Sequence, residues 1–258
     1  MNCEGPIVQG QRFCSSCGQR AEVHRISAHE VVHDTVHYFT HADKSIFRLV
    51  KSLALQPGVA AREYVAGKRT QWFKPLNFLL IVAAIIALMT GLFYKENDKI
   101  VVKMRQSAER IENPAAKNNL LQKARRVENV NYITGRYSNI INIVATPFVT
   151  IFFWLAYRKR FNYFECLVGH MYFTGFVTLL YALIFVPLIN IFPAINLYAL
   201  GLFFLIEVLY KAVSFYRFNN VPGTGPLLKA GLTSFFTTIF WIALTGTAIA
   251  FYIAGKLF

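Results

Sequence analysis

The sequence predicts an all-α, polytopic membrane protein with about five transmembrane helices, an N-terminal cysteine-bearing head and amphipathic interfacial helices. Of its 258 residues, 55% are hydrophobic, and the mean hydropathy is +0.40, which is more apolar than an average soluble domain. The apolar residues gather in long uncharged runs, and about 20 such residues in a helix span a hydrocarbon core of about 30 Å. Because the runs are continuous rather than alternating, they do not fit a membrane β-barrel.

The first apolar run, Leu76–Tyr94, contains 19 residues and no charged side chain. Four further runs are long enough for spans, at residues 140–157, 166–190, 191–210 and 230–254. We therefore divide the chain into five parts. They are a head (1–25), cytoplasmic interfacial amphipathic helices (26–75), the first transmembrane helix (76–94), an extramembrane helical hairpin (95–138) and a four-helix transmembrane bundle (139–258).

The net charge of +14 is best explained by membrane topology. If the N-terminus is cytoplasmic, the short loops after the second and fourth spans are cytoplasmic and basic, as the positive-inside rule requires. The segment 95–136 is the exception, with ten Lys and Arg against five Asp and Glu, but long loops translocate largely regardless of charge. We expect an inner-membrane protein with a cytoplasmic N-terminus and membrane lipids, not nucleic acid, as partners.

Basic and aromatic residues precede the first span. Residues 43–55 carry an apolar stripe typical of an amphipathic helix, and Pro57 ends that helix. The stretch KRTQWFKP at 68–75 then anchors the first span at the cytoplasmic interface. These residues could also bind anionic headgroups or a phosphorylated ligand. The interface residues that we select are Arg62, Lys68, Arg69, Trp72 and Lys74.

Cysteines in the head indicate a zinc site. Cys14 and Cys17 form a CxxC pair followed by Gly18, and Cys3 lies eleven residues upstream of Cys14. Four soft ligands complete a tetrahedral zinc site, so His24 is the candidate fourth ligand. A head without metal is the alternative. Reduced cysteines fit the cytoplasmic side of the membrane.

Histidines recur at every fourth position from His29 to His41. On a helix, i, i+4 neighbours face each other, so His33 and His37 could bind one metal ion. The letters HEVVH at 29–33 also match the zinc-protease pattern. No third ligand is apparent, so an interfacial helix rich in imidazole is the preferred interpretation, with metal or pH sensing as the alternative.

Ionisable residues inside the spans are candidates for function because they are costly there. Glu207 is the best of them, and its expected partner is Lys211, one turn later, whose side chain could extend toward the cytoplasm. His170 lies near the start of the third span. In the second span, Asn142, Thr146 and Pro147 predict a kink.

Several motifs together carry a family resemblance. FCSSCGQ, HYFTHADKS and LALQPGVAAREYVAGKRTQWFKPLNFLL, within residues 1–80, resemble a family of bacterial inner-membrane proteins common in Bacteroidota, catalogued as domain of unknown function 3667. The resemblance implies a multi-pass inner-membrane protein with a zinc-ribbon-like head. This head is degenerate, because Pro6 stands where the family has the second cysteine.

Three hypotheses for function follow. The preferred one is a non-enzymatic scaffold, or a sensing or interaction protein, that binds a protein partner through its cytoplasmic head. The first alternative is a small transporter or channel that uses Glu207 and His170. The second alternative is a metal-dependent membrane hydrolase that uses HEVVH. Zinc is the only cofactor that we consider.

Overall fold

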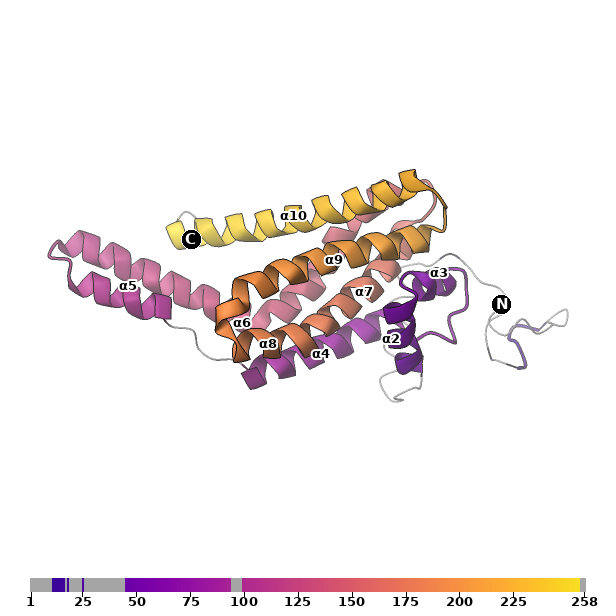
Figure 1. Cartoon of the computed structure of the whole chain (residues 1–258), viewed down its shortest axis with the longest axis horizontal. Helices are drawn as coiled ribbons and strands as arrows, with labels where there is room; N and C mark the ends of the chain where they lie inside the picture. Colours follow the sequence, from indigo (N-terminus) through magenta and orange to yellow (C-terminus); the bar gives the residue numbers. More distant parts are fainter. Residues whose placement is uncertain (1–10, 17, 19–24, 26–44, 94–98, 256–258) are drawn as a thin grey trace.

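The computed structural model describes residues 11–16, 18, 25, 45–93 and 99–255. The secondary-structure elements of this part are helices whose long members run along one axis (Figure 1). In chain order they are α2 (Ser45–Leu55), α3 (Val59–Val65), α4 (Pro75–Phe93), α5 (Lys99–Glu109), α6 (Pro114–Tyr157), α7 (Tyr163–Leu180), η1 (Tyr181–Phe185), α8 (Val186–Ile191), η2 (Pro193–Ile195), α9 (Asn196–Asn219) and α10 (Thr224–Ala254).

Four helical segments of the described residues are long and apolar enough to cross a membrane, namely 75–93, 163–191, 193–219 and 224–254. The apolar end of α6, Ile141–Tyr157, is shorter. The five apolar runs of the sequence fall on these segments in order, and the all-α polytopic fold class is confirmed. Large apolar side chains cover the outside of α10, where bilayer lipid would solvate them. They include Leu232, Phe235, Phe236, Ile239, Leu244 and Phe251.

Helix α7 is the centre of the bundle. It packs against α4, α6 and α9 along its length and against α2 and α3 at its start. Half of an apolar 18-residue stretch within Tyr163–Ile191 is buried, against 11% for a stretch of the same length in α10. A π-helical turn, Tyr181–Phe185, links α7 to α8, in which Pro187 occupies the first turn. Proline has no N–H to donate, and π-turns of this kind are frequent at functional sites.

The hairpin outside the bundle is formed by α5 and the first part of α6 (Figure 1). Asn113 caps α6, because its side chain accepts hydrogen bonds from the backbone N–H groups of Ala115 and Ala116. The 44 residues of α6 extend for about 66 Å, roughly twice the thickness of a hydrocarbon core. The second helix of the predicted hairpin therefore continues without interruption into the second span.

Helices α2 and α3 lie at the opposite end of the bundle (Figure 1). The apolar stripe of α2 is buried at Leu49 and Leu53, which join a core with Tyr64 of α3. The stripe thus packs on the protein itself. Between the two helices, Gly58 has a φ of 89°, and a Cβ added there would lie 2.4 Å from the carbonyl oxygen of Ser214 in α9. Glycine is required at this crossing for both reasons.

Candidate functional site

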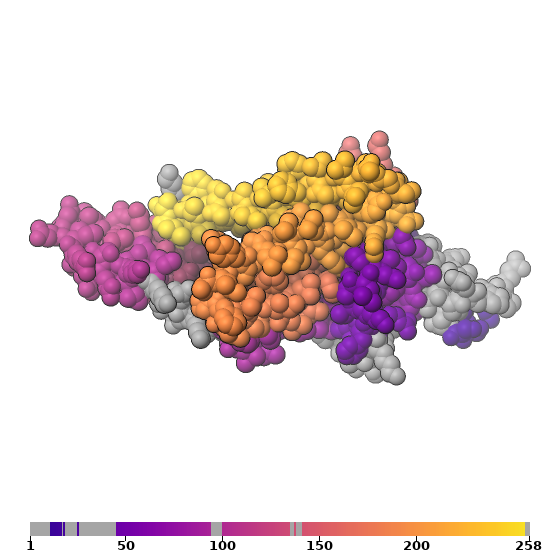
Figure 2. All heavy atoms as spheres, viewed as in Figure 1, coloured from indigo at the N-terminus to yellow at the C-terminus, as the bar shows by residue number. Residues whose placement is uncertain are grey.

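A cavity of about 490 Å³ lies among α4, α6, α7, α8, α9 and α10, toward the hairpin end of the bundle. Figure 2 shows a recess on this side, between the C-terminal part of α10 and the start of α9. The volume is within the range of small-molecule sites, about 300–1,000 Å³. Its wall mixes apolar and polar side chains. The polar ones are Thr90, Thr134, Asn142, Thr174, Thr178, Tyr181, Asn190, Glu207, Trp241 and Thr245.

Glu207, on the wall of this cavity, forms an ion pair with Lys211, which does not line it. The Nζ atom of Lys211 is 2.6 Å from Oε1 of Glu207 and donates a hydrogen bond to it, as the i, i+4 spacing predicts. Glu207 occupies the middle of α9, about 17 Å from either end of the helix. The Lys211 side chain is 8% exposed and that of Glu207 18%. Lys211 therefore keeps its ammonium group inside the bundle, beside Glu207.

A smaller cavity of about 70 Å³ adjoins the ion pair. Both Glu207 and Lys211 line it, together with His170 of α7. His170 is 1% exposed, and its Nδ1 lies 2.8 Å from the hydroxyl oxygen of Thr150. That hydroxyl donates its single proton to the carbonyl of Thr146 at 2.7 Å. Nδ1 of His170 is therefore the donor to Thr150, which fixes the orientation of the ring.

Stacked aromatic rings fill the bundle between these cavities and α3. The rings of Phe153 and Phe215 stack with centroids 4.0 Å apart, and Phe218 and Tyr157 extend the cluster. Along α9 the order is thus Glu207, Lys211, Phe215 and Phe218, from the cavity to the closed end. Packed side chains therefore close the end of the bundle nearest α3.

Polar residues without charge complete the site, and sequence reasoning missed most of them. Thr174 and Asn190 line the large cavity, and Thr174 also lines the small one. The Thr174 hydroxyl has no hydrogen-bond partner among the described residues. Asn142 lines both cavities, although the sequence suggested only a kink there. A lone threonine or asparagine in an apolar run gives no signal of which helix it faces.

The predicted interface residues make contacts within the protein. Arg62 donates to the side-chain oxygen of Asn220 at 2.6 Å and to the carbonyl of Arg217 at 3.3 Å, so it caps the end of α9. Glu63 accepts from the indole of Trp72 at 3.1 Å and lies 3.8 Å from Lys68. Trp72 is 8% exposed and belongs to the core, while Arg69 and Lys74 are half-buried. Lipid binding by these residues stays a prediction.

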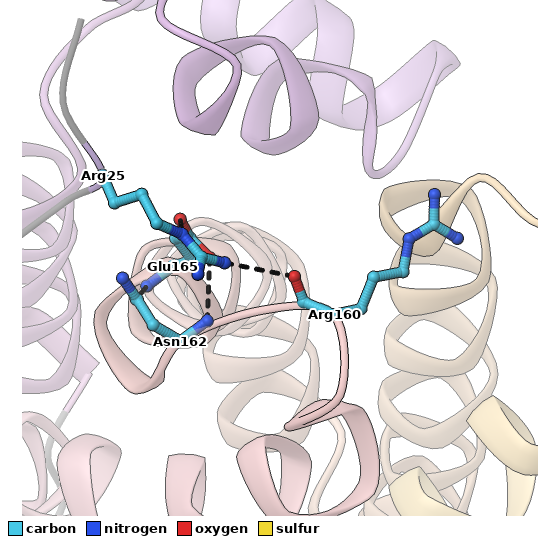
Figure 3. A network of polar contacts seen from close by, with 4 residues as sticks. All are labelled: Arg25, Arg160, Asn162 and Glu165. Atoms are coloured by element: carbon cyan, nitrogen blue, oxygen red, sulfur yellow. Dashed lines mark hydrogen bonds and ion pairs between the residues drawn. The ribbon is translucent and has the colours of Figure 1, made fainter.

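Arg25 connects the head to the start of α7 (Figure 3). Its guanidinium group donates to both carboxylate oxygens of Glu165, at 3.0 and 3.1 Å, and to the carbonyl of Arg160. Glu165 also closes a capping box with Asn162. The hydrogen bond from Arg25 to Glu165, followed by the charge of that carboxylate, raises the pKa of Arg25 above its ordinary value. Glu165, 4% exposed, thus binds Arg25 and caps the helix terminus at once.

Most of the predicted metal ligands lie outside the described residues. These are Cys3, Cys17, His24, His33 and His37, together with the HEVVH sequence. Cys14 is buried, and the N–H of Gly18 donates to its carbonyl at 2.9 Å, with Gly18 at a φ of 68°. Within the described ranges, no group of three or more His, Cys, Asp or Glu could hold a metal ion. The zinc site therefore stays a prediction.

The fold defines the chain as a polytopic helical membrane protein with polar cavities among its apolar helices. Residues 43–86 match a family described as "Protein of unknown function (DUF3667)", the family that the sequence motifs predict. The match covers α2, α3 and the first part of α4, so most of the cavity lies beyond it. No curated protein and no solved structure matches the chain.

Proposed function

We propose that the chain is a non-enzymatic carrier that binds a small zwitterionic group in the cavity beside Glu207 and Lys211 and moves it across the membrane. This carrier corresponds to the small transporter among the three hypotheses for function drawn from the sequence. The observation that carries it is the position of Glu207, which is paired with Lys211, lies halfway along an apolar helix and lines a cavity of ligand size.

The cost of this ion pair supports a role in binding. Two charges buried away from water lose several kcal/mol of solvation each, and their mutual attraction alone does not reliably offset the loss. Ionisable residues within membrane spans accordingly mark substrate pathways in many proteins. Neither Glu207 nor Lys211 links α9 to a neighbouring helix by a hydrogen bond or ion pair that the structure shows, so the pair is not explained as a connection between helices.

The chemistry of the pair indicates the class of ligand. Glu207 presents a carboxylate and Lys211 an ammonium group to the small cavity of about 70 Å³, and Glu207 also lines the large one. A zwitterionic ligand can pair its ammonium group with Glu207 and its acidic group with Lys211. Each side chain then replaces its partner in the protein with an opposite charge of the ligand. Thr174, Thr178 and Asn190 add hydroxyl and amide groups to the large cavity, which Glu207 also lines. A ligand with a single net charge would leave one member of the pair without compensation.

Flux through proteoliposomes tests the proposal with glycerophosphoethanolamine as the radiolabelled zwitterionic probe. We expect Glu207→Gln to reduce uptake by roughly tenfold or more, since a hydrogen bond to a charged group contributes about 1.5–3 kcal/mol. Glu109→Gln makes the same chemical change at an exposed position of α5 and should retain wild-type uptake. Equal uptake by wild type, both variants and empty liposomes would exclude the carrier.

A second candidate is the interaction or sensing protein, and the contact between Arg25 and Glu165 favours it. In this proposal the head lies in the cytoplasm, holds zinc through Cys3, Cys14, Cys17 and His24, and binds a protein partner. Its attachment to the first turn of α7 would transmit binding to the bundle. The flux measurement separates the two candidates, because only the carrier requires uptake that depends on Glu207. An inner-membrane location is part of both proposals.

A further inference from the structure

A second, apolar groove of about 390 Å³ runs between α6 and α10. It shares four lining residues with the large cavity, so the two spaces adjoin. These are Thr134, Asn142, Trp241 and Thr245. Away from them the groove is lined by apolar side chains and one tyrosine, namely Val130, Ile133, Ile141, Ala248, Ile249 and Tyr252. The site therefore has a polar part and an apolar part side by side.

The length of the groove matches an extended hydrocarbon chain within one leaflet. Along α10 it extends from Trp241 to Tyr252, which is about 16 Å of helix and about half of a 30 Å hydrocarbon core. This length suits one extended hydrocarbon chain spanning one leaflet.

The outward face of α10 gives this groove access to lipid. Ala248, on the groove, is exposed, and α10 is the least buried of the candidate spans. An occupant can therefore enter sideways from the bilayer while its polar end reaches the cavity between α9 and α10. An apolar groove that opens toward lipid gives a water-soluble solute no favourable contacts.

We propose that the ligand is a lipid-class amphiphile, with its zwitterionic headgroup beside Glu207 and Lys211 and one hydrocarbon chain in the groove between α6 and α10. This inference rests on the proposed function and specifies its substrate class. The polar wall of the cavity replaces the hydration of the headgroup. The apolar side chains of the groove replace the lipid around the hydrocarbon chain. The headgroup thus stays in polar surroundings and the hydrocarbon chain in apolar ones.

Photocrosslinking tests the inference with lysophosphatidylethanolamine that carries a diazirine in its chain. In wild-type protein we expect crosslinks on α6 and α10. Ala248→Trp fills the groove and should reduce the yield about tenfold, whereas Ala250→Trp, two residues away and also exposed, should not change it. Ile133→Trp blocks the groove from the facing helix and should repeat the loss, which guards against a folding defect in a single variant.

Different outcomes separate this inference from the proposed function. If both groove variants crosslink like Ala250→Trp, the groove does not hold the chain, and the inference is overturned. Should Glu207→Gln abolish uptake of the chain-free probe glycerophosphoethanolamine at the same time, the carrier itself stands. If Glu207→Gln changes neither uptake of that probe nor crosslinking, the cavity does not bind the headgroup, and both proposals fail.

Discussion

Replacing Lys211 with methionine should destabilise the protein by about 3–5 kcal/mol. The ammonium group is 8% exposed and lies 2.6 Å from Glu207, in the middle of an apolar helix. Methionine fills a similar volume but leaves the carboxylate of Glu207 without its cationic partner. An uncompensated charge at this depth is among the largest single-residue penalties in a membrane protein. Reversible unfolding in detergent micelles at neutral pH measures the change in free energy.

Two comparisons show whether the loss comes from the buried charge. The double variant Glu207→Gln/Lys211→Met removes both charges and should recover most of the stability, since neutral replacement of a buried pair is often tolerated. Arg105→Met breaks the exposed pair with Glu128 in the hairpin, whose side chains are 50% and 41% exposed, and should cost less than about 1 kcal/mol. Equal losses for Lys211→Met and Arg105→Met would show that Glu207 is solvated, contrary to the structure.

Gly58→Ala should destabilise the protein by at least about 3 kcal/mol and separate α3 from α9. The backbone at Gly58 has a φ of 89°, which residues with a Cβ adopt only with strain. The new Cβ would also lie 2.4 Å from the carbonyl oxygen of Ser214 and 2.8 Å from the backbone nitrogen of Phe218. These are backbone atoms of α9, which cannot rotate away as a side chain can.

The matched control for this substitution is Gly246→Ala in α10. An added Cβ at Gly246 has no described atom within 4 Å, and alanine favours a helix by about 1 kcal/mol over glycine. We therefore expect no loss of stability there. Thermal unfolding of both variants in the same micelles gives the comparison, and a Gly58→Ala protein as stable as Gly246→Ala would contradict the close crossing of α3 and α9.

Features that depend on neighbouring residues in the chain were predictable from the sequence. Apolar runs fix the positions of the spans, because crossing requires only length and hydropathy, and they coincide with α4, the end of α6, α7–α8, α9 and α10. The pair of Glu207 and Lys211 was predictable because i, i+4 side chains of a helix are adjacent whatever else surrounds them. The amphipathic pattern of α2 likewise needs only the helical period.

Features that depend on packing between distant segments were not predictable. The stripe of α2 could face lipid or protein, and only the position of α7 and α3 decides that it faces protein. The sequence around Trp72 predicts an interfacial anchor, but its indole is buried against Glu63. The hydrogen bond between Thr150 and His170 joins residues on two helices, 20 positions apart in the chain. The cavity is lined by side chains from six α-helices. A single sequence contains no signal for such helix pairings.

Water access to the cavity tests the central claim most directly. In a chain whose four cysteines are replaced by alanine, a single cysteine is placed at Thr178, on the cavity wall, or at Ala243, an exposed position of α10 outside the cavities. We expect a charged, membrane-impermeant thiol reagent to label Thr178→Cys from the hairpin side of sealed vesicles and to leave Ala243→Cys unlabelled. If both positions resist the reagent from either side, the cavity is closed to water and Glu207 does not face a solute pathway.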